Sequence, residues 1–145
     1  MSRPPVAREN VLDAFESILI DKGERFATMD ATAKAAGVSK GGLLYHFASK
    51  QALEEGLLAR LDLLVQEDLD AIASAKEGVV AYFLRSSTTS GTPVDRAIVA
   101  ATRLAQGGDA AANASLRGIR EQWADLIRPH VRDATALDLV LLVSD

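Results

Sequence analysis

The side chains with the clearest chemical use lie close together in the sequence and combine hydroxyl, basic and aromatic groups with two glycines. These residues are Thr28, Ser39, Lys40, Gly41, Gly42, Tyr45, His46 and Lys50. Paired glycines remove side chains, so a helix that contains them can lay its backbone close to another surface. Lys40 supplies charge, while Tyr45 and His46 supply hydrogen-bonding groups on flat rings. Such groups suit contact with the base edges and phosphates of DNA.

Two short helices joined by a tight turn must position these residues. Residues 37–39 form the predicted turn, and the Ser39 hydroxyl can cap the second helix by accepting a backbone N–H. By helical periodicity, Leu43, Leu44 and Phe47 fall on one side of the second helix, opposite the glycines and polar rings. The pattern predicts a helix-turn-helix whose second helix fits a DNA major groove. Periodicity alone is equally compatible with an alanine-rich helical hairpin whose polar face is only solvated.

The order and spacing of these residues resemble the DNA-binding domain of TetR-family transcriptional regulators over roughly the first third of the chain. The matching residues are Thr28, Ala33, the run Ala36 to Gly41, the run Tyr45 to Phe47, Ser49, Lys50 and Leu53. The resemblance implies that Thr28 and Lys50 contact DNA phosphates. Two positions differ from the family pattern. Thr32 replaces an isoleucine, and Leu44 stands where most members carry a phosphate-contacting tyrosine, one residue before Tyr45. The GGLLYHF segment is similar to a variant found within the family.

Composition argues against several other classes of protein. The 145 residues are 48% hydrophobic and include no cysteine, which excludes a disulfide framework and a thiolate metal site. The sequence has two histidines and no Glu-x-x-His pair, phosphate-binding glycine loop or Ser-His-Asp order, so we expect no enzyme, cofactor or metal. It also lacks a membrane-length apolar run and a signal-peptide core, which predicts a cytoplasmic protein.

Charge is unevenly distributed along the chain. The formal net charge is −4, yet residues 1–50 carry seven basic and six acidic side chains, whereas residues 51–145 carry nine and fourteen. The acidic part is therefore not the part expected to meet phosphate. A nearly neutral DNA-binding domain predicts modest non-specific affinity, with basic residues placed individually rather than massed.

The expected fold class is all-α. The resemblance implies a helix-turn-helix DNA-binding domain at residues 1–50 and an effector-binding and dimerisation domain at residues 51–145. A first helix over about residues 6–22 packs its apolar stripe on the helix-turn-helix, and Phe26 fills the base of this core. From the preceding arm, Arg3, together with Arg8, could reach a phosphate or the minor groove, or the arm is simply solvated. A long helix over about residues 50–76 links the domains, and four further helices follow.

The resemblance implies that the second domain binds a small molecule and pairs two subunits. Tyr82, Phe83 and Trp123 are candidate ligand-binding residues, with an ordinary core position as the alternative for each. His130 is expected at a helix end or on the surface. The last helix, over residues 135–143, is so apolar that a partner subunit could bury it. Family members usually run further, so we expect either a domain shortened at Asp145 or a sequence that is part of a longer chain.

These features favour a ligand-responsive transcriptional repressor that binds a near-palindromic operator as a homodimer and is released by a small molecule. In this hypothesis, the ligand shifts the population toward a state in which the long helix has moved. The two DNA-binding domains then no longer match the operator spacing. The alternative is a helical adaptor or small-molecule carrier that does not bind DNA.

Overall fold

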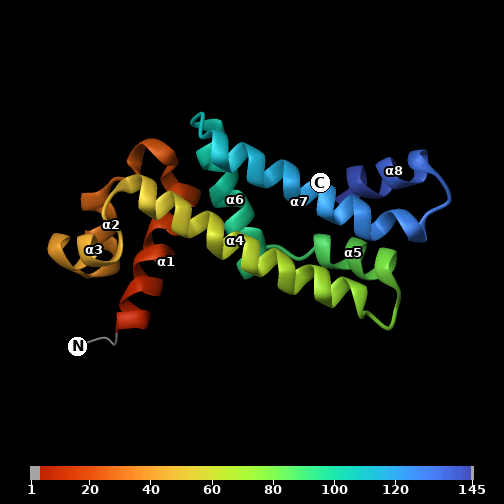
Figure 1. Ribbon diagram of the computed structural model, residues 1–145, viewed down its shortest axis with the longest axis horizontal. Helices are drawn as coiled ribbons and strands as arrows, with labels where there is room; N and C mark the ends of the chain where they lie inside the picture. Colours follow the sequence, from red (N-terminus) through yellow and green to blue (C-terminus); the bar gives the residue numbers. More distant parts are fainter. Residues whose placement is uncertain (1–3, 145) are drawn as a thin grey trace.

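The computed structural model describes residues 4–144, which form eight α-helices and two 3-10 turns and contain no strand (Figure 1). The helices are α1 Pro4–Lys22, α2 Met29–Ala36, α3 Lys40–His46, α4 Lys50–Ala73, α5 Val79–Ser87, α6 Pro93–Gln106, α7 Ala110–Ile127 and α8 Ala134–Ser144, and the turns are η1 Glu24–Phe26 and η2 Arg128–His130. The predicted all-α fold class is therefore confirmed. Arg3 and Asp145, with the expectations attached to them, lie outside the described residues.

Helix α4 is the longest element and runs from the end of the molecule that holds α2 and α3 to the end that holds α5 (Figure 1). Its buried residues enter three successive apolar clusters. Leu53 and Leu57 pack with α1, Leu61 and Val65 pack with α6 and α7, and Ile72 packs with α5 and α8. Burial of one helix in all three clusters couples the position of one end of the molecule to the other.

The first cluster closes the three N-terminal helices into one core. Phe15 of α1, Ala33 of α2 and Leu43 of α3 are buried together, and α6 and α7 also contribute residues to this cluster. Thr32 is fully buried, and its hydroxyl donates to the Thr28 carbonyl oxygen at 2.7 Å. The hydroxyl that replaces the expected isoleucine is therefore satisfied within its own helix.

Local capping fixes where several helices begin. In six of them a side-chain oxygen accepts the backbone N–H of the residue three positions on, at 2.7 to 3.2 Å. The capping residues are Thr28, Ser39, Ser49, Thr92, Asp109 and Asp133. Gly37 ends α2 with φ of 69°, a left-handed conformation that glycine adopts without steric cost. The predicted caps of α2 and α3 are thus confirmed.

Two sequence-based expectations about packing and length are wrong. Phe26 is 59% exposed and does not fill the base of the core. The η1 turn directs Phe26 outward, and Ala27 takes the buried place beside it. Helix α4 ends at Ala73 rather than near residue 76, and the Ser74 hydroxyl donates to the Asp70 carbonyl oxygen of the last turn at 2.8 Å.

A buried carboxylate joins three helices. Glu16 on α1 is 6% exposed, accepts a hydrogen bond from Arg96 Nε of α6 at 3.3 Å, and lies 3.8 Å from Arg60 Nη1 of α4. Arg60 also binds the carboxylates of Glu9 and Asp13 on α1, each at 2.7 Å. Burial raises the pKa of Glu16, although the two guanidinium groups act in the opposite direction. The network ties α1 to both α4 and α6.

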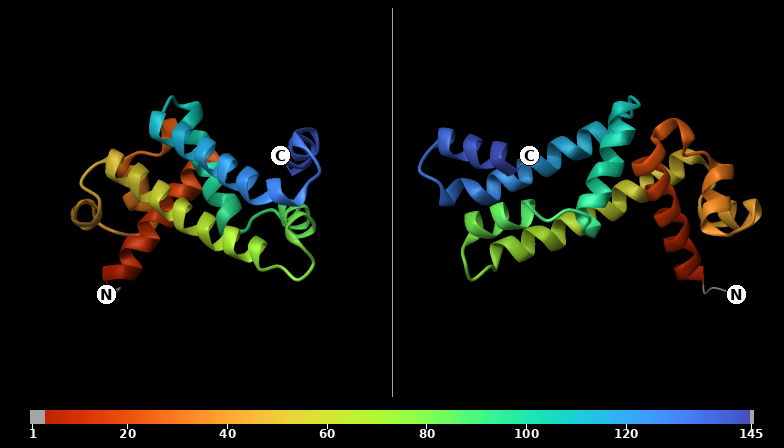
Figure 2. Two further views of the ribbon diagram at one scale, coloured as in Figure 1. Left: turned by 45° about the vertical axis from the view of Figure 1, so that its right-hand side comes forward. Right: turned by 180° about the vertical axis from the view of Figure 1, so that it is seen from behind.

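At the far end, α5, α8 and the C-terminal half of α7 lie together (Figure 2). On α8, Leu137 and Leu141 are buried against this cluster. Leu139, Leu142 and Val143 are 61%, 67% and 70% exposed. The apolar last helix therefore has one covered side and one uncovered apolar side within the described part of the chain.

We predict that Gly56→Ala destabilises the fold, although alanine normally favours a helix over glycine. A Cβ at residue 56 would lie 2.8 Å from Phe47 Cε1 and 3.3 Å from Leu12 Cδ2. The expected loss is about 1–3 kcal/mol in the free energy of unfolding. The matched control is Gly118→Ala in α7, where an added Cβ meets nothing within 4 Å and should gain about 0.5–1 kcal/mol. Urea denaturation measures both, and equal stabilisation by the two variants would contradict this packing.

Candidate nucleic-acid interface and effector cavity

Helix α3 presents an open face away from the core. Leu43 is fully buried, whereas Tyr45 is 80% exposed and Gly41 is exposed. A Cβ built at Gly41 would find only the Ser39 Oγ, at 4.0 Å. Gly42 is half-buried, and a Cβ there would lie 3.2 Å from the same oxygen. Gly41 thus leaves the backbone open to a ligand, and Gly42 mainly leaves room for the Ser39 cap.

At the C-terminal end of α3, one aromatic ring turns into the core and two stay outside it. Phe47 leaves the helix with φ of −137° and ψ of 107°, and its ring turns into the core at 3% exposure. The Tyr45 and His46 rings stay outside the core edge to face, with centroids 5.0 Å apart. Leu44, predicted to pack inward, is 43% exposed because the turn of the helix places it between buried Leu43 and exposed Tyr45. Residues 44 and 45 therefore both reach the open side.

The two lysines expected to contact DNA are both held by carboxylates of this chain. Lys40 Nζ lies 3.2 Å from Asp30 Oδ1 in an exposed pair, which contributes little to stability. Lys50 Nζ lies 2.6 Å from Glu24 Oε1 and 3.2 Å from the Glu24 carbonyl oxygen. The Lys50 and Glu24 side chains are about one-third exposed. Sequence reasoning missed this pair because 26 residues separate its members.

The remaining predicted contacts lie at helix starts or beside the Phe47 ring. Thr28 and Ser39 are exposed, and their hydroxyls cap α2 and α3. The Arg8 guanidinium lies over the Phe47 ring, 4.9 Å from its centroid. Arg8 therefore stands beside the base of α3, and a phosphate contact by Arg8 stays a prediction.

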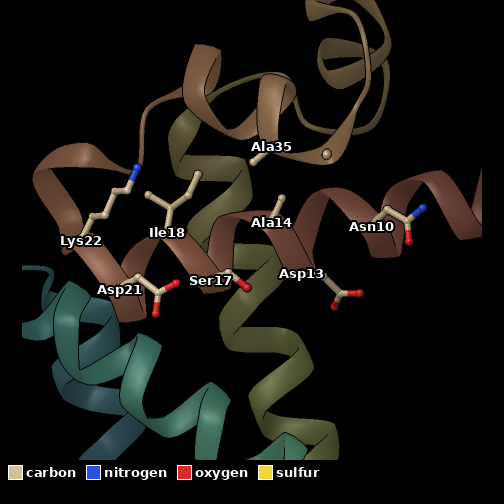
Figure 3. A pocket seen from close by; sticks show the side chains of 9 residues that line it. Asn10, Asp13, Ala14, Ser17, Ile18, Asp21, Lys22 and Ala35 are labelled. Carbon is tan, nitrogen blue, oxygen red and sulfur yellow. The ribbon is translucent and has the colours of Figure 1, made fainter.

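A shallow recess of about 500 Å³ lies between α1 and α2. Figure 3 shows its polar side chains along α1, with Ala35 of α2 facing them. None of the residues predicted to contact DNA or a ligand lines it. Asp13 accepts from Arg60, and Ser17 accepts from Arg96 at 3.1 Å. Two of its polar groups are thus already used within the fold.

A second cavity, of about 530 Å³, lies in the C-terminal part of the molecule. Its lining residues come from α4 to α8 and the loop before α6, and they are Asp68, Tyr82, Phe83, Arg85, Ser86, Ser87, Thr89, Thr92, Val94, Asp95, Ile98, Trp123 and Ser144. The structure thus brings Tyr82, Phe83 and Trp123 to one cavity. The Phe83 and Trp123 rings meet edge to face at 5.8 Å. His130 is exposed and does not line this cavity.

Sequence reasoning missed Asp68, the carboxylate in this cavity. It lies on α4 and accepts a hydrogen bond from Trp123 Nε1 at 3.1 Å. Burial raises the pKa of Asp68, and the bond from the indole only partly opposes that effect. In the sequence Asp68 is one of several acidic residues on α4, so no local pattern marks it.

Within residues 4–144, no helix combines the length and apolar character that crossing a membrane requires. The same residues contain no cluster of three or more potential metal ligands. What the described chain does contain is a capped pair of short helices with an open second helix, followed by a helical bundle with a cavity. This architecture defines a helix-turn-helix protein with a companion helical domain.

Comparison with known proteins finds similarity to one family of regulators. Residues 11–57 match the family described as bacterial regulatory proteins, tetR family. The HTH-type transcriptional repressor KstR2 of Mycolicibacterium smegmatis is 34% identical over 89 residues, which are 59% of this chain and 43% of that protein. The match therefore spans less than half of the length of that curated relative. Together these matches support a regulator of the TetR family, and this family evidence points to a regulator rather than an enzyme.

Two solved structures share the fold. A crystal structure described as a transcriptional regulator from Streptomyces coelicolor A3(2) superposes with a TM-score of 0.64 at 22% identity, covering 94% of this chain and 82% of the other. A TetR-family transcriptional regulator from Rhodococcus sp. superposes with a TM-score of 0.63 at 23% identity, covering 95% and 84%. The helical domain after the helix-turn-helix therefore also follows the arrangement seen in these two regulators.

Proposed function

We propose that this protein is a ligand-responsive transcriptional repressor of the cytoplasm that binds a near-palindromic DNA operator as a homodimer. The observation that carries the proposal is the open face of α3, where Gly41 and Tyr45 are exposed while Leu43 is buried. Because α3 packs against the core on one face and is exposed on the other, its exposed face can enter a DNA major groove. Lys40, Tyr45 and His46 are the side chains proposed to meet base edges or nearby phosphates.

Phosphate contacts are assigned to residues at helix starts. Thr28, Ser39 and Lys50 stand at the N-terminal ends of α2, α3 and α4, where backbone N–H groups favour an anion. Thr28 and Ser39 keep exposed side chains while they cap. Lys50 reaches a phosphate by leaving Glu24 or by bridging the two. Because the domain is nearly neutral, these individual contacts must provide most of the salt-dependent affinity.

The uncovered apolar side of α8 supports the proposed homodimer. Leu139, Leu142 and Val143 expose most of their surface in the single chain. A two-fold pair would bury these residues and place two α3 helices on successive parts of one operator.

The proposed release mechanism runs through α4 and α6. Thr92, Val94 and Asp95 of the cavity wall directly precede Arg96, which bonds to Glu16 of α1. A ligand that displaces the start of α6 would therefore act on the network that holds α1. The ligand shifts the population only by its difference in affinity between the DNA-compatible and incompatible arrangements.

A DNA titration tests the proposed function. A duplex carrying the sequence upstream of the chain's own gene should bind with nanomolar to micromolar affinity that falls steeply with salt. Gly41→Leu should weaken binding at least tenfold because the new side chain fills the open face. Gly118→Leu, a glycine-to-leucine change in α7 with no neighbour within 4 Å of its Cβ, is the control. Binding that ignores sequence and salt would favour the adaptor, and full affinity in Gly41→Leu would refute the assigned face.

Glu24→Gln should strengthen DNA binding about threefold to tenfold, because it removes a carboxylate that competes with phosphate for Lys50. Lys50→Ala should reduce the slope of affinity against salt by about one. Glu67→Gln, an exposed change of equal charge on α4, controls for net charge. Fluorescence anisotropy at several salt concentrations measures all three. If Glu24→Gln and Glu67→Gln raised the DNA affinity equally, the gain would reflect net charge, and competition between Glu24 and phosphate for Lys50 would be refuted.

Leu142→Glu should convert the dimer to a monomer, because a carboxylate placed on the apolar side of α8 is costly to bury. Analytical ultracentrifugation should then give half the mass of the unmodified protein. Val6→Glu, an exposed apolar position on α1, is the control and should leave the mass unchanged. A Leu142→Glu protein that sediments as the unmodified one does would exclude this side of α8 as the interface.

A further inference from the structure

The polar groups of the 530 Å³ cavity are mainly hydrogen-bond acceptors. Asp68 contributes a carboxylate that is used once, by the Trp123 indole, and it forms no ion pair within residues 4–144. The hydroxyls of Ser86 and Ser87 both donate to the Phe83 carbonyl oxygen, at 3.0 and 2.7 Å. Because these hydroxyls donate to the backbone, their oxygen lone pairs can accept hydrogen bonds from a ligand.

The positively charged residue of the cavity wall, Arg85, is already paired with a carboxylate of this chain. Arg85 forms a two-pronged pair with the Glu77 carboxylate, and its guanidinium lies 5.0 Å from the centroid of the Tyr82 ring. Asp95, the second acidic residue of the wall, accepts the Gly91 backbone N–H at 2.7 Å. The described lining thus has more unneutralised negative than positive charge, which disfavours an anionic ligand.

Aromatic rings stand directly beside the free carboxylate. Trp123 both bonds to Asp68 and meets Phe83 edge to face, and Tyr82 lines the same cavity. Ring faces attract cations, most strongly for tryptophan. Val94 and Ile98 complete an apolar part of the wall. A carboxylate next to a tryptophan, with aliphatic and aromatic walls around it, matches a molecule that has a charged amine at one end and an apolar body.

We propose that the effector is a cationic amphipathic amine, with a protonated nitrogen at Asp68 and an aromatic or aliphatic body against Phe83, Val94 and Ile98. This inference rests on the proposed effector site and names the chemistry that the site selects. The volume suits a drug-sized molecule rather than a metabolite of a few atoms. Asp68 is the residue that distinguishes amines from neutral molecules of the same shape.

The test uses three probes of one shape and different charge: biphenyl-4-ylmethylamine, biphenyl-4-ylmethanol and biphenyl-4-carboxylate. Trp123 is the only tryptophan of the chain, so its fluorescence in the DNA-free protein reports binding at this cavity. The amine should bind at least tenfold more tightly than the alcohol, and the carboxylate should bind most weakly. Asp68→Asn should lose at least tenfold for the amine and leave the alcohol unchanged.

Asp70→Asn is the matched control, since Asp70 is an exposed residue on the same helix outside the cavity wall, and it should bind all three probes as the unmodified protein does. Thermal unfolding of each variant checks that the fold is intact. Tighter binding of the carboxylate, equal affinity for amine and alcohol, an Asp68→Asn protein with unchanged amine affinity, or no amine binding at millimolar concentration would each overturn the inference. Because DNA is absent, these outcomes are independent of the operator titration.

Discussion

The close packing of α4 on the end of α3 is the constraint on which the rest of the structure depends. Gly56 has no side chain, so α4 lies against the Phe47 ring at a distance that a Cβ would forbid. Phe47 directly follows α3, and burial of its ring fixes how that helix is turned. Tyr45 and Gly41 face outward as a result. Because the same α4 carries Lys50 at its start and Asp68 in the cavity wall, a residue proposed to contact DNA and one proposed to contact the ligand share one helix.

The charged side chains discussed above form individual ion pairs rather than a patch of one sign. Lys40 and Lys50, both proposed to contact DNA, are each paired with an acidic residue of this chain, which offsets their charge. Glu16 is buried between two arginines that belong to α4 and α6. An uncompensated charge at that depth would be costly, so the three helices are held in one arrangement.

Features encoded by neighbouring residues were predictable from the sequence. The Thr28 and Ser39 caps and the Gly37 turn each depend on a few adjacent positions, and the structure has them where the sequence placed them. Features that depend on distant residues were not predictable. Phe26 and Ala27 differ in burial because of the η1 turn, and the Glu24–Lys50 and Asp68–Trp123 pairs join separate helices. The aromatic part of the cavity was foreseen, but its carboxylate was not.

Chemical-shift mapping of the 15N-labelled protein with the upstream duplex tests the central claim most directly. Glycine amides fall in a separate region of the spectrum, so Gly41 and Gly42 on the open helix can be compared with Gly118 on α7 in one experiment. The account predicts large shifts for Gly41, Gly42 and the Tyr45 amide as DNA is added, and none for Gly118. A complex in which the Gly41 and Tyr45 amides do not move while residues elsewhere do would contradict it.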